Sequence, residues 1–557
     1  MGLQEKVIYQ IYVKSFMDSN GDGLGDIRGI TMKLDYLRKL GVDYLWLTPV
    51  FVSPMNDNGY DVADYYAVDP SFGTMEDLDE LIAETKKRGM DIMLDMVFNH
   101  TSTEHEWFRK AMAGDETYRN YYIFRKGSGG KPPTNWVSKF GGNAWEYVED
   151  SDDYYLHLFD RTQADLNWDN PEVRKELYKV VNFWLDKGVK GFRFDVVNLI
   201  SKPSVFEDDQ DGDGRRFYTD GERIHEYLKE LNRNTFGKRE DIITVGEMSS
   251  TNIDNSIRYS NPEEEELSMI FNFHHLKVDY DAGNKWTLKP FDFIELKTIF
   301  NDWQSAMERH QGWMALFYNN HDQPRVVSRF GNDSVYRTKA AKMLATSIHL
   351  MRGTPYIYQG EEIGMTNAGF SNIEEYRDVE SINYHGILRA EGLSEEETLA
   401  ILRERSRDNA RTPMRWTNEK GFGFTEGEPW IPFGNGERIN AEDDQNHGES
   451  VNHHYRKLIE LRKSHPVIAS GSFRMLDLDH EHVYAYIREY EGKRLLVVNN
   501  FYGETLNYSL MEAMGPEGPV FDGTEDYTLL LSNYDDILME NRAITLRPYE
   551  SLALYIE

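Results

Sequence analysis

A chain of 557 residues, 40% hydrophobic and 13% aromatic, is long enough for more than one folded unit and too apolar to be disordered. The absence of cysteine excludes disulfides, thiol catalysis and cysteine-ligated metals. A formal net charge of −33, from 62 basic and 95 acidic residues, repels nucleic acid and anionic membranes at long range, so we expect neither as a partner. A few basic side chains focused at one place could still bind a phosphorylated ligand.

The N-terminal stretch MGLQEKVIYQIYVKSF has no basic segment followed by an apolar one. Nowhere do about 18 apolar residues run together, as a membrane-spanning helix requires. We therefore expect a cytoplasmic protein that does not enter a membrane. The sequence does not determine the oligomeric state, and a monomer is the simplest expectation.

Short β-rich runs alternate with amphipathic helical segments, such as 75–89 and 171–188, through most of the chain. Eight strand–helix pairs are what a closed parallel barrel requires, and such a barrel carries its catalytic groups at the C-terminal ends of the strands. The predicted strands are 7–16, 44–50, 91–100, 191–197, 242–248, 268–273, 315–322 and 354–360.

Two regions depart from this alternation. An aromatic segment containing Gly and Pro separates the third predicted strand from the helix at 171, which predicts a subdomain inserted over the catalytic face. From about residue 473 strand follows strand, with turns between them, which predicts an all-β module. The expected α/β fold is a (β/α)8 TIM barrel at 1–100 and 171–472, an inserted subdomain at 101–170 and a C-terminal β-sandwich domain at 473–557.

Three acidic residues each close a β-rich run: Asp195 in GFRFDVVN, Glu247 in IITVGEM and Asp322 in YNNHDQP. One such acid alone would more often belong to a structural ion pair, but three on the same predicted barrel favour a functional site. Arg193 lies two residues before Asp195 and so shares its face of the strand. Cleavage of a glycosidic bond needs a carboxylate nucleophile and a protonated carboxylic acid, and a third acid can stabilise the positive charge that develops on the sugar.

The segments DMVFNHTS, ADLNW, GFRFDVVN, VGEM and NNHDQPR resemble, in this order, the signature regions of the α-amylase family, glycoside hydrolase family 13. The resemblance extends over nearly the whole chain. It implies that Asp195 is the nucleophile, Glu247 the general acid/base and Asp322 the transition-state stabiliser. It also implies that His100 and His321 donate hydrogen bonds to the glucose, and that catalysis needs no cofactor. Glu247 would have to remain protonated near neutrality, through desolvation or a neighbouring carboxylate.

The same resemblance assigns further residues to the sugar pocket. Arg193 would keep Asp195 ionised through its opposite charge. Asp61 in DNGYDVADYY and Arg407 in RSRDNARTPM resemble the pair that closes the pocket in members acting on a terminal glucose. Val196 resembles the residue found in members that cleave α-1,6 or α-1,1 bonds, which disfavours maltose and starch as substrates.

Two loops resemble those of family members that hydrolyse trehalose 6-phosphate: DGDGRRFYTDG from residue 211 and FNFHHLKVDYDAGNKWTLKPF from residue 271. Both should overhang the mouth of the barrel. Their basic side chains could converge on an anion beyond the scissile bond, where each contact to phosphate would contribute about 1.5–3 kcal/mol. These side chains are Lys277, Lys285, Arg215 and Arg216. The alternative is that they lie in solvent or neutralise Asp209, Asp211 and Asp213.

We therefore expect retaining hydrolysis of trehalose 6-phosphate, a sugar phosphate, to glucose and glucose 6-phosphate. An alternative is an oligo-1,6-glucosidase acting on the non-reducing end of isomalto-oligosaccharides, although such enzymes tend to have an acidic residue where Lys277 stands. A sucrose isomerase or transferase is disfavoured because residues 277–281 read KVDYD, where isomerases carry Arg-Leu-Asp-Arg-Asp. A non-catalytic relative, such as a transporter heavy chain, would have a membrane span and would lack catalytic acids.

The segment DSNGDGLGD carries oxygen-bearing side chains at alternate positions around a glycine-containing bend. Alternating oxygen donors suit Ca²⁺ better than a transition metal, and similar loops in relatives hold structural calcium. The predicted ligands are Asp18, Asn20, Asp22, Asp26 and the backbone carbonyl of Leu24. The alternative is an Asp/Asn-rich turn without a metal ion.

Overall fold

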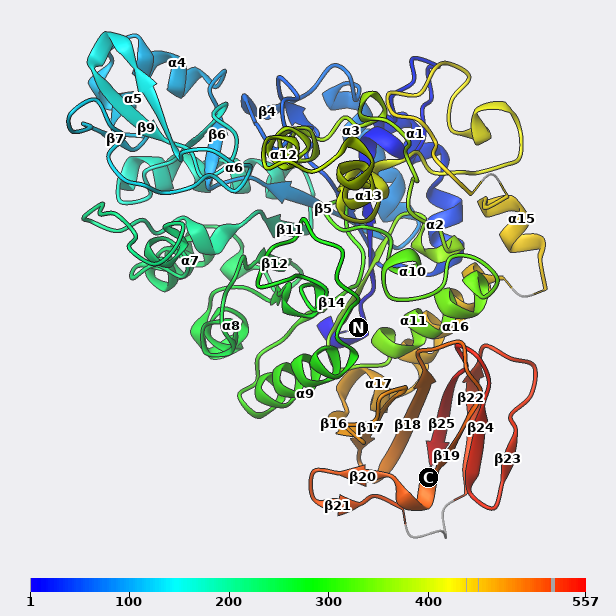
Figure 1. Ribbon diagram of the computed structural model, residues 1–557. Coiled ribbons are helices and arrows are strands. Elements are labelled where there is room, and N and C mark those ends of the chain that lie inside the picture. The colour runs from blue at the N-terminus through cyan, green and yellow to red at the C-terminus, as the bar shows by residue number, and fades with distance from the viewer. Residues whose placement is uncertain (1, 437, 449, 522–525, 557) are drawn as a thin grey trace.

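The computed structural model describes residues 2–436, 438–448, 450–521 and 526–556, so the outermost residues of the predicted domains, 1 and 557, lie outside it. Its central strands are β1 (Ile8–Ile11), β2 (Tyr44–Leu47), β5 (Asp91–Met96), β11 (Gly191–Phe194), β12 (Ile243–Glu247), β13 (Met269–Phe271), β14 (Ala315–Leu316) and β15 (Thr354–Tyr358). Within the described residues they form one eight-stranded sheet in the order β13-β12-β11-β5-β2-β1-β15-β14. A parallel bridge from Ile270 to Met314 joins its two edges. The predicted barrel is therefore confirmed (Figure 1).

Several of these strands are shorter than predicted. The predicted run 191–197 pairs only to Phe194, and the run 315–322 only to Leu316. Asp195 directly follows the last paired residue of its strand, and Asp322 lies six residues after the last paired residue of β14, so both stand on the loops that leave the C-terminal end of the barrel. The central strands themselves are almost wholly buried, as expected for parallel strands covered on both faces.

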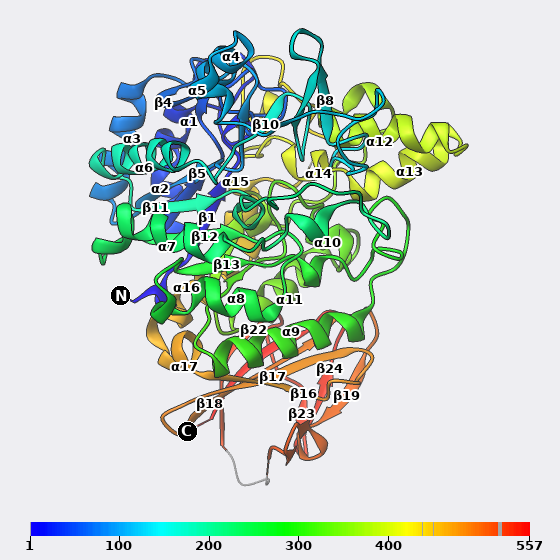
Figure 2. The ribbon, with the colours of Figure 1, turned by 90° about the vertical axis from the view of Figure 1, so that its left-hand side faces the viewer.

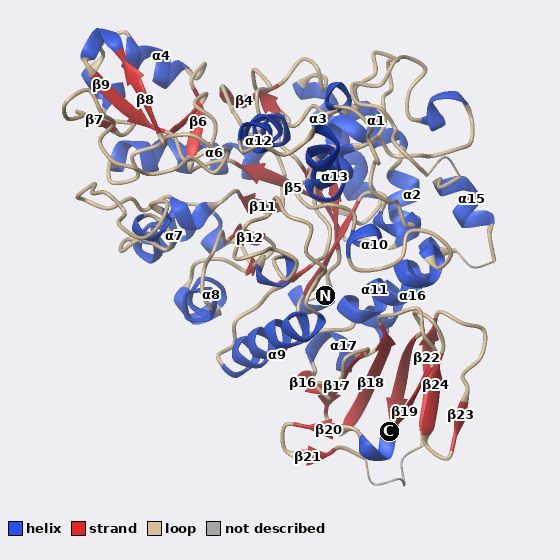
Figure 3. Ribbon diagram, viewed as in Figure 1, coloured by secondary structure: helices blue, strands red, loops and turns tan. Residues whose placement is uncertain are grey.

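Helices surround the barrel (Figure 3). Two of them end within two residues of the predicted limits: α3 (Met75–Lys87), which begins with a capping box from Thr74, and α6 (Pro171–Asp186), which begins with proline behind an Asn170 cap. The other helices are α1 (Ile27–Met32), α2 (Leu34–Leu40), α7 (Ile224–Asn234), α8 (Ile253–Ser260), α9 (Phe293–Arg309), α10 (Val326–Arg329), α11 (Arg337–His349), α12 (Val379–Ala390), α13 (Glu395–Arg405), α14 (Asp408–Arg411), α15 (Ala441–Asn446), α16 (Val451–Ser464) and α17 (Pro466–Ser470). No helix of the described residues is long and apolar enough to cross a membrane.

The segment between β5 and α6 forms a separate lobe at one end of the molecule (Figure 1). It contains β6 (His100–Ser102), α4 (Glu106–Met112), α5 (Glu116–Arg119), β7 (Phe124–Arg125), β8 (Trp145–Val148), β9 (Asp153–Leu156) and β10 (Gln163–Asp165). Its aromatic core around Trp136 also takes in Val196 and Leu199, from the loop after β11. The inserted segment is thereby packed onto the C-terminal end of the barrel. The limits 101–170 stay a prediction.

A smaller hairpin, β3 (Phe51–Val52) with β4 (Asp64–Val68), adds the loop 53–63 to the same end of the barrel. Helix α12 also lies at this end of the barrel. Its Asn383 donates a hydrogen bond to the carbonyl of Phe140 in the inserted segment, 3.2 Å away. Figure 2 shows β8 and α12 together at this end of the molecule. The C-terminal end of the barrel is therefore covered by chain segments that are far apart in sequence.

The C-terminal part is all-β, as predicted. Its core is shared by the sheets β16-β17-β18-β25-β22 and β19-β24-β23, with a short pair β20-β21 at one side. The strands are β16 (Ser472–Leu476), β17 (Val483–Tyr490), β18 (Lys493–Asn500), β19 (Leu506–Ser509), β20 (Met514–Gly515), β21 (Gly518–Pro519), β22 (Tyr527–Ser532), β23 (Met539–Glu540), β24 (Ala543–Leu546) and β25 (Ser551–Ile556). Helix α9 lies against this module (Figure 2), and its Lys297 donates to the carbonyls of Asp477 and His480.

Candidate active site

A buried guanidinium forms the centre of the site. Arg193 of β11 is 1% exposed and stands beside Asp95 in the register of β5 and β11. Its Nη1 donates to Asp95 at 2.7 Å and to Asp195 at 2.5 Å, while Nη2 donates to Glu247. Burial alone would lower the pKa of Arg193, but Asp95 and Asp195 raise it above the ordinary value. One permanent cation thus joins the predicted nucleophile to the predicted acid.

Asp195 and Glu247 are 8% and 9% exposed and stand at the ends of neighbouring strands. Because the same guanidinium contacts both, their separation is limited to about the width of that group. The separation of about 5–5.5 Å expected of a retaining glycosidase stays a prediction. Val196, which follows Asp195, has φ of 36°, an unfavourable conformation for a β-branched residue. Its packing in the core of the inserted segment holds this turn in place.

Two arginines and a histidine contact Asp322. Its Oδ1 accepts hydrogen bonds from Arg411 at 2.8 Å and from Arg407 at 3.2 Å, and its Oδ2 lies 3.3 Å from Nε2 of His321. Burial would raise the pKa of Asp322, but His321 and the two arginines lower it well below its usual range. The carboxylate is therefore ionised at neutral pH, as stabilisation of a developing positive charge requires.

The two predicted sugar-binding histidines meet at Tyr60. His321 stacks on the Tyr60 ring, with the ring centres 5.0 Å apart and the planes at 4°. Nε2 of His100 lies 3.0 Å from the Tyr60 carbonyl and 3.2 Å from Nε2 of Gln163. Burial lowers the pKa of His100, which favours its neutral ring. The structure thus places both histidines on one wall, and their contacts to glucose stay a prediction.

The structure does not bring Asp61 and Arg407 into contact. Arg407 instead donates to Asp57 at 3.2 Å and also to Asp378, at the start of α12. Asp61 is fully buried, and its carboxylate accepts hydrogen bonds from the backbone N–H groups of residues 56 and 57 and from the hydroxyl of Ser53. Asp61 therefore shapes the turn that presents Asp57 to the arginine. A direct contact of Asp61 with the sugar stays a prediction.

Several site residues were missed by the sequence reasoning. Asp95 interrupts the apolar run IMLDM, and this is the same signal that identified the other acids. Asp57 lies four residues before Asp61 in the same loop, and the resemblance of Asp61 to the pocket-closing acid of the family drew the prediction to Asp61. Asp378 and Arg411 carry no local signal, because they come from the long connection after β15 and only the fold brings them to Asp322 and Arg407.

The two arginines of the loop after β11 behave as the alternative interpretation predicted. Arg215 forms a bidentate ion pair with Asp213, in which Nε donates to Oδ1 at 2.9 Å and Nη2 to Oδ2 at 2.6 Å. Arg216 donates to Asp209 at 2.8 Å. These pairs are solvent-exposed on the arginine side. The charges of Arg215 and Arg216 are thus largely balanced inside their own loop.

The two lysines of the loop after β13 differ from each other. Lys285 is paired with Glu380 at 2.7 Å. Lys277 contacts no carboxylate among the described residues, and its Nζ lies 3.4 Å from the hydroxyl of Ser250. Burial and the nearby Arg215 lower the pKa of Lys277 to about 8. Of the four basic residues singled out in the sequence, Lys277 is thus the one whose charge is left without an acidic partner in the described structure.

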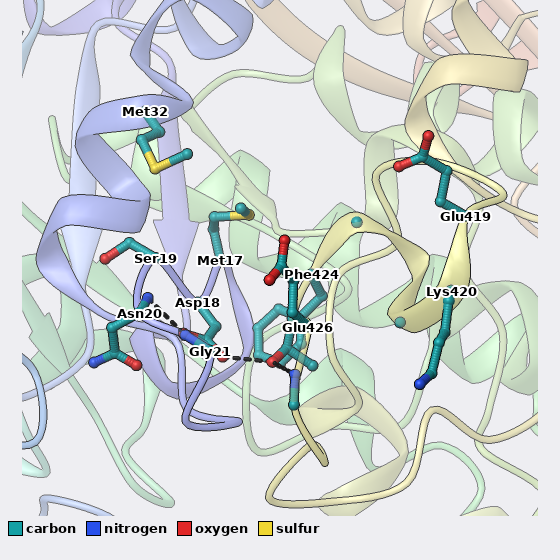
Figure 4. Close-up of a pocket in the computed structure, with 14 residues that line it drawn as sticks. Met17, Asp18, Ser19, Asn20, Gly21, Met32, Glu419, Lys420, Phe424 and Glu426 are labelled. Atoms are coloured by element: carbon teal, nitrogen blue, oxygen red, sulfur yellow. Dashed lines mark hydrogen bonds between the residues drawn. The ribbon is translucent and has the colours of Figure 1, made fainter.

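The predicted calcium loop lies beside a cavity of about 600 Å³, bordered by residues 17–21 and 419–427 (Figure 4). Asp18 accepts hydrogen bonds from the N–H groups of Asn20, Gly21 and Gly23, and Asp22 accepts one from Leu24. Asp26 caps α1. The predicted metal ligands all bind through oxygen, as Ca²⁺ prefers. However, the described residues contain no group of three or more acidic or histidine side chains placed to hold a metal. These contacts are those of an Asp-rich turn, and calcium stays a prediction.

A guanidinium that joins two carboxylates at the C-terminal end of a (β/α)8 barrel, beside a third acid, fits the class of glycoside hydrolases. Residues 10–471 match the family model described as alpha amylase, catalytic domain. Residues 483–552 match the alpha-amylase SusG C-terminal domain. The chain therefore belongs to the alpha-amylase family.

Full-length relatives share this organisation. The chain is 52% identical to the trehalose-6-phosphate hydrolase of Bacillus subtilis strain 168, over 99% of this chain and 97% of that protein. It is 47% identical to an oligo-1,6-glucosidase of Bacillus cereus, over 100% and 99% of the two chains. The crystal structure of the trehalose-6-phosphate hydrolase of Bacillus licheniformis matches with a TM-score of 0.94 at 51% identity, covering 100% of this chain and 99% of that one.

Proposed function

We propose that this enzyme hydrolyses α,α-trehalose 6-phosphate to glucose and glucose 6-phosphate with retention of configuration. The position of Lys277 carries the proposal. A general acid protonates the oxygen of the leaving group, so the loop that follows Glu247 faces the leaving sugar. The ammonium of Lys277 lies on Ser250, three residues after Glu247. A leaving glucose with a 6-phosphate would supply the anion that this lysine lacks.

The arrangement of carboxylates supports the corresponding mechanism. Asp195, which accepts a hydrogen bond from Arg193, attacks the anomeric carbon of the unphosphorylated glucose while Glu247 gives its proton to the glycosidic oxygen. Glucose 6-phosphate leaves, and a covalent glucosyl–Asp195 ester remains. Glu247, now a carboxylate, takes a proton from water, which cleaves the ester and releases glucose. Asp322 stabilises the positive charge on the ring in both steps.

The far end of the pocket supports action on a terminal glucose. Arg407 is bound by Asp57 and Asp378, and the ring of Phe140 covers it at 4.9 Å. These groups come from the loop 53–63, the inserted segment and the start of α12, so they close the pocket from three directions. A sugar chain that continued past this point would have to displace a buried ion-pair network.

A substrate panel tests the proposal. One charge-assisted contact to phosphate contributes about 1.5–3 kcal/mol, which corresponds to about 10- to 150-fold in kcat/KM. Trehalose 6-phosphate should therefore be cleaved at least tenfold faster than trehalose or isomaltose at low concentration. A preference for isomaltose would replace the proposal with the oligo-1,6-glucosidase alternative.

Charge reversal at Lys277 gives a second test. Lys277→Glu should raise KM for trehalose 6-phosphate, because a carboxylate would then repel the phosphate, with a much smaller effect on nitrophenyl α-glucoside. Lys289→Glu is the matched control, since Lys289 is exposed on the same loop and its ammonium lies 3.4 Å from the carbonyl of Tyr280. Equal losses on the two substrates would make Lys277 a structural residue and remove the main support for the phosphate.

A further inference from the structure

A further lysine, which no sequence signal identified, reaches the same place from the inserted segment. Lys139 lies between β7 and β8, and its N–H donates to the carbonyl of Leu158 at 2.9 Å. The preceding Ser138 donates through its hydroxyl to Phe159 at 2.7 Å. The following Phe140 covers Arg407. The backbone at Lys139 is thus held from both sides, next to a residue that borders the glucose pocket.

The side chain of Lys139 ends on the loop that carries the predicted general acid. Its Nζ lies 3.4 Å from the hydroxyl of Ser249, and the Nζ of Lys277 lies 3.4 Å from the hydroxyl of Ser250. Asn198 holds this loop, accepting from the N–H of Ser249 and donating to its carbonyl, both at 2.9 Å. Two ammonium groups from different segments are therefore placed on adjacent serines just beyond Glu247.

Neither ammonium of this pair of lysines contacts a carboxylate in the part of the chain that the structure describes. Among the described residues Lys139 contacts no carboxylate, and its neighbour besides Ser249 is the ring of Tyr218, 5.8 Å away. Asp213 and Asp165 are the acids that act on it electrostatically, and they are already bound by Arg215 and Lys202. Contacts of 3.4 Å to serine are too long to hold an ammonium firmly.

Burial, Arg215 and Lys277 lower the pKa of Lys139 to about 8, which means that its charge is disfavoured in the free enzyme. Two like charges kept close together in a half-buried site are unfavourable unless an anion binds between them. An anionic ligand would relieve both the desolvation and the repulsion. The inserted segment would then contribute directly to the recognition of that ligand.

We infer that Lys139 is a specificity-determining residue whose ammonium, together with that of Lys277, binds the 6-phosphate of the leaving glucose. The inference rests on the proposed function and extends it, because it gives the inserted segment a direct part in choosing the phosphorylated substrate. It also explains why a lysine stands beside Phe140, since this placement lets one short segment contact both sugars of the disaccharide.

The test compares Lys139→Met with wild-type enzyme on trehalose 6-phosphate and on nitrophenyl α-glucoside. For the variant, kcat/KM on the phosphorylated substrate should fall about 10- to 100-fold, chiefly through KM, and far less on the nitrophenyl substrate. Inhibition of nitrophenyl glucoside cleavage by glucose 6-phosphate should weaken to a similar degree, whereas inhibition by glucose should not. Lys131→Met, an exposed lysine of the same inserted segment, is the control and should change none of these values.

The outcomes separate the inference from the proposed function. A wild-type enzyme without preference for the phosphorylated substrate would overturn the proposed function, and the inference with it. A wild-type preference that survives in Lys139→Met, or equal losses on both substrates, would overturn the inference alone. Lys139→Arg keeps the charge and should recover most of the preference for phosphate, which a purely structural lysine would not predict.

Discussion

Replacement of Arg193 by lysine tests the central feature of the site. The guanidinium is a rigid fork that donates in parallel to Asp95, Asp195 and Glu247 from a position that is 1% exposed. A lysine ammonium keeps the positive charge but ends in a single nitrogen on a flexible stem. We expect it to keep one of these carboxylate contacts and to lose the other two.

The magnitude follows from the contacts that are lost. A hydrogen bond to a charged group contributes about 1.5–3 kcal/mol, so loss of two of them should lower the free energy of unfolding by about 3–6 kcal/mol. The range agrees with the roughly 3–5 kcal/mol measured for breaking buried ion pairs. Because Asp195 would also lose its fixed orientation, a loss of about 3 kcal/mol at the transition state would reduce kcat/KM about 100-fold.

Urea unfolding followed by tryptophan fluorescence, together with kcat/KM, measures both effects. Arg174→Lys is a suitable control, because Arg174 is also buried but lies on α6, where it contacts Glu230 and the carbonyl of Trp168. This control should lose less stability and keep its activity. If Arg193→Lys unfolds at the wild-type urea concentration and keeps its kcat/KM within threefold, the guanidinium does not organise the site as argued.

The other predictions concern pH, the general acid and calcium. The ratio of kcat/KM for trehalose 6-phosphate to kcat/KM for trehalose cancels the ionisation of the catalytic groups. This ratio should be high from about pH 6, where the phosphate becomes a dianion, and should fall as pH rises through about 8, where Lys139 and Lys277 lose their protons. A ratio that stays flat to pH 10 would exclude these lysines as phosphate ligands. Glu247→Gln should lose about 10²- to 10⁴-fold in turnover. Azide, a nucleophile that needs no general base, should restore glucosyl transfer from nitrophenyl α-glucoside. A lack of rescue by azide would argue against Glu247 as the general acid/base. If the loop 18–26 binds calcium, removal of the ion by a chelator should lower the melting temperature while leaving kcat unchanged at 25 °C. Calcium at 100 times its Kd would stabilise the folded protein by about 2.7 kcal/mol. An unchanged melting temperature would mean that the loop is a turn without metal.

Much of this enzyme was determined by local pattern alone. Alternating strands and helices predicted the barrel, because strands buried on both faces must be nearly all apolar and each needs a helix to cover it. The same rule exposed Asp195 and Glu247 as charges at the ends of apolar runs, and Asp322 as the acid that closes the β-rich run 315–322. The two-residue period of a strand placed Arg193 on the face of Asp195, and the structure shows them in contact.

Only the tertiary structure decided which charges meet. The register of β5 and β11 brought Asp95 to Arg193, and the turn at 53–57 placed Asp57, in preference to Asp61, against Arg407. Local periodicity sets the direction in which a side chain points, but an ion pair between distant segments depends on how the loops between them close. Lys139 is the clearest case, because its neighbours in the sequence give no sign of the loop beyond Glu247 on which its ammonium comes to lie.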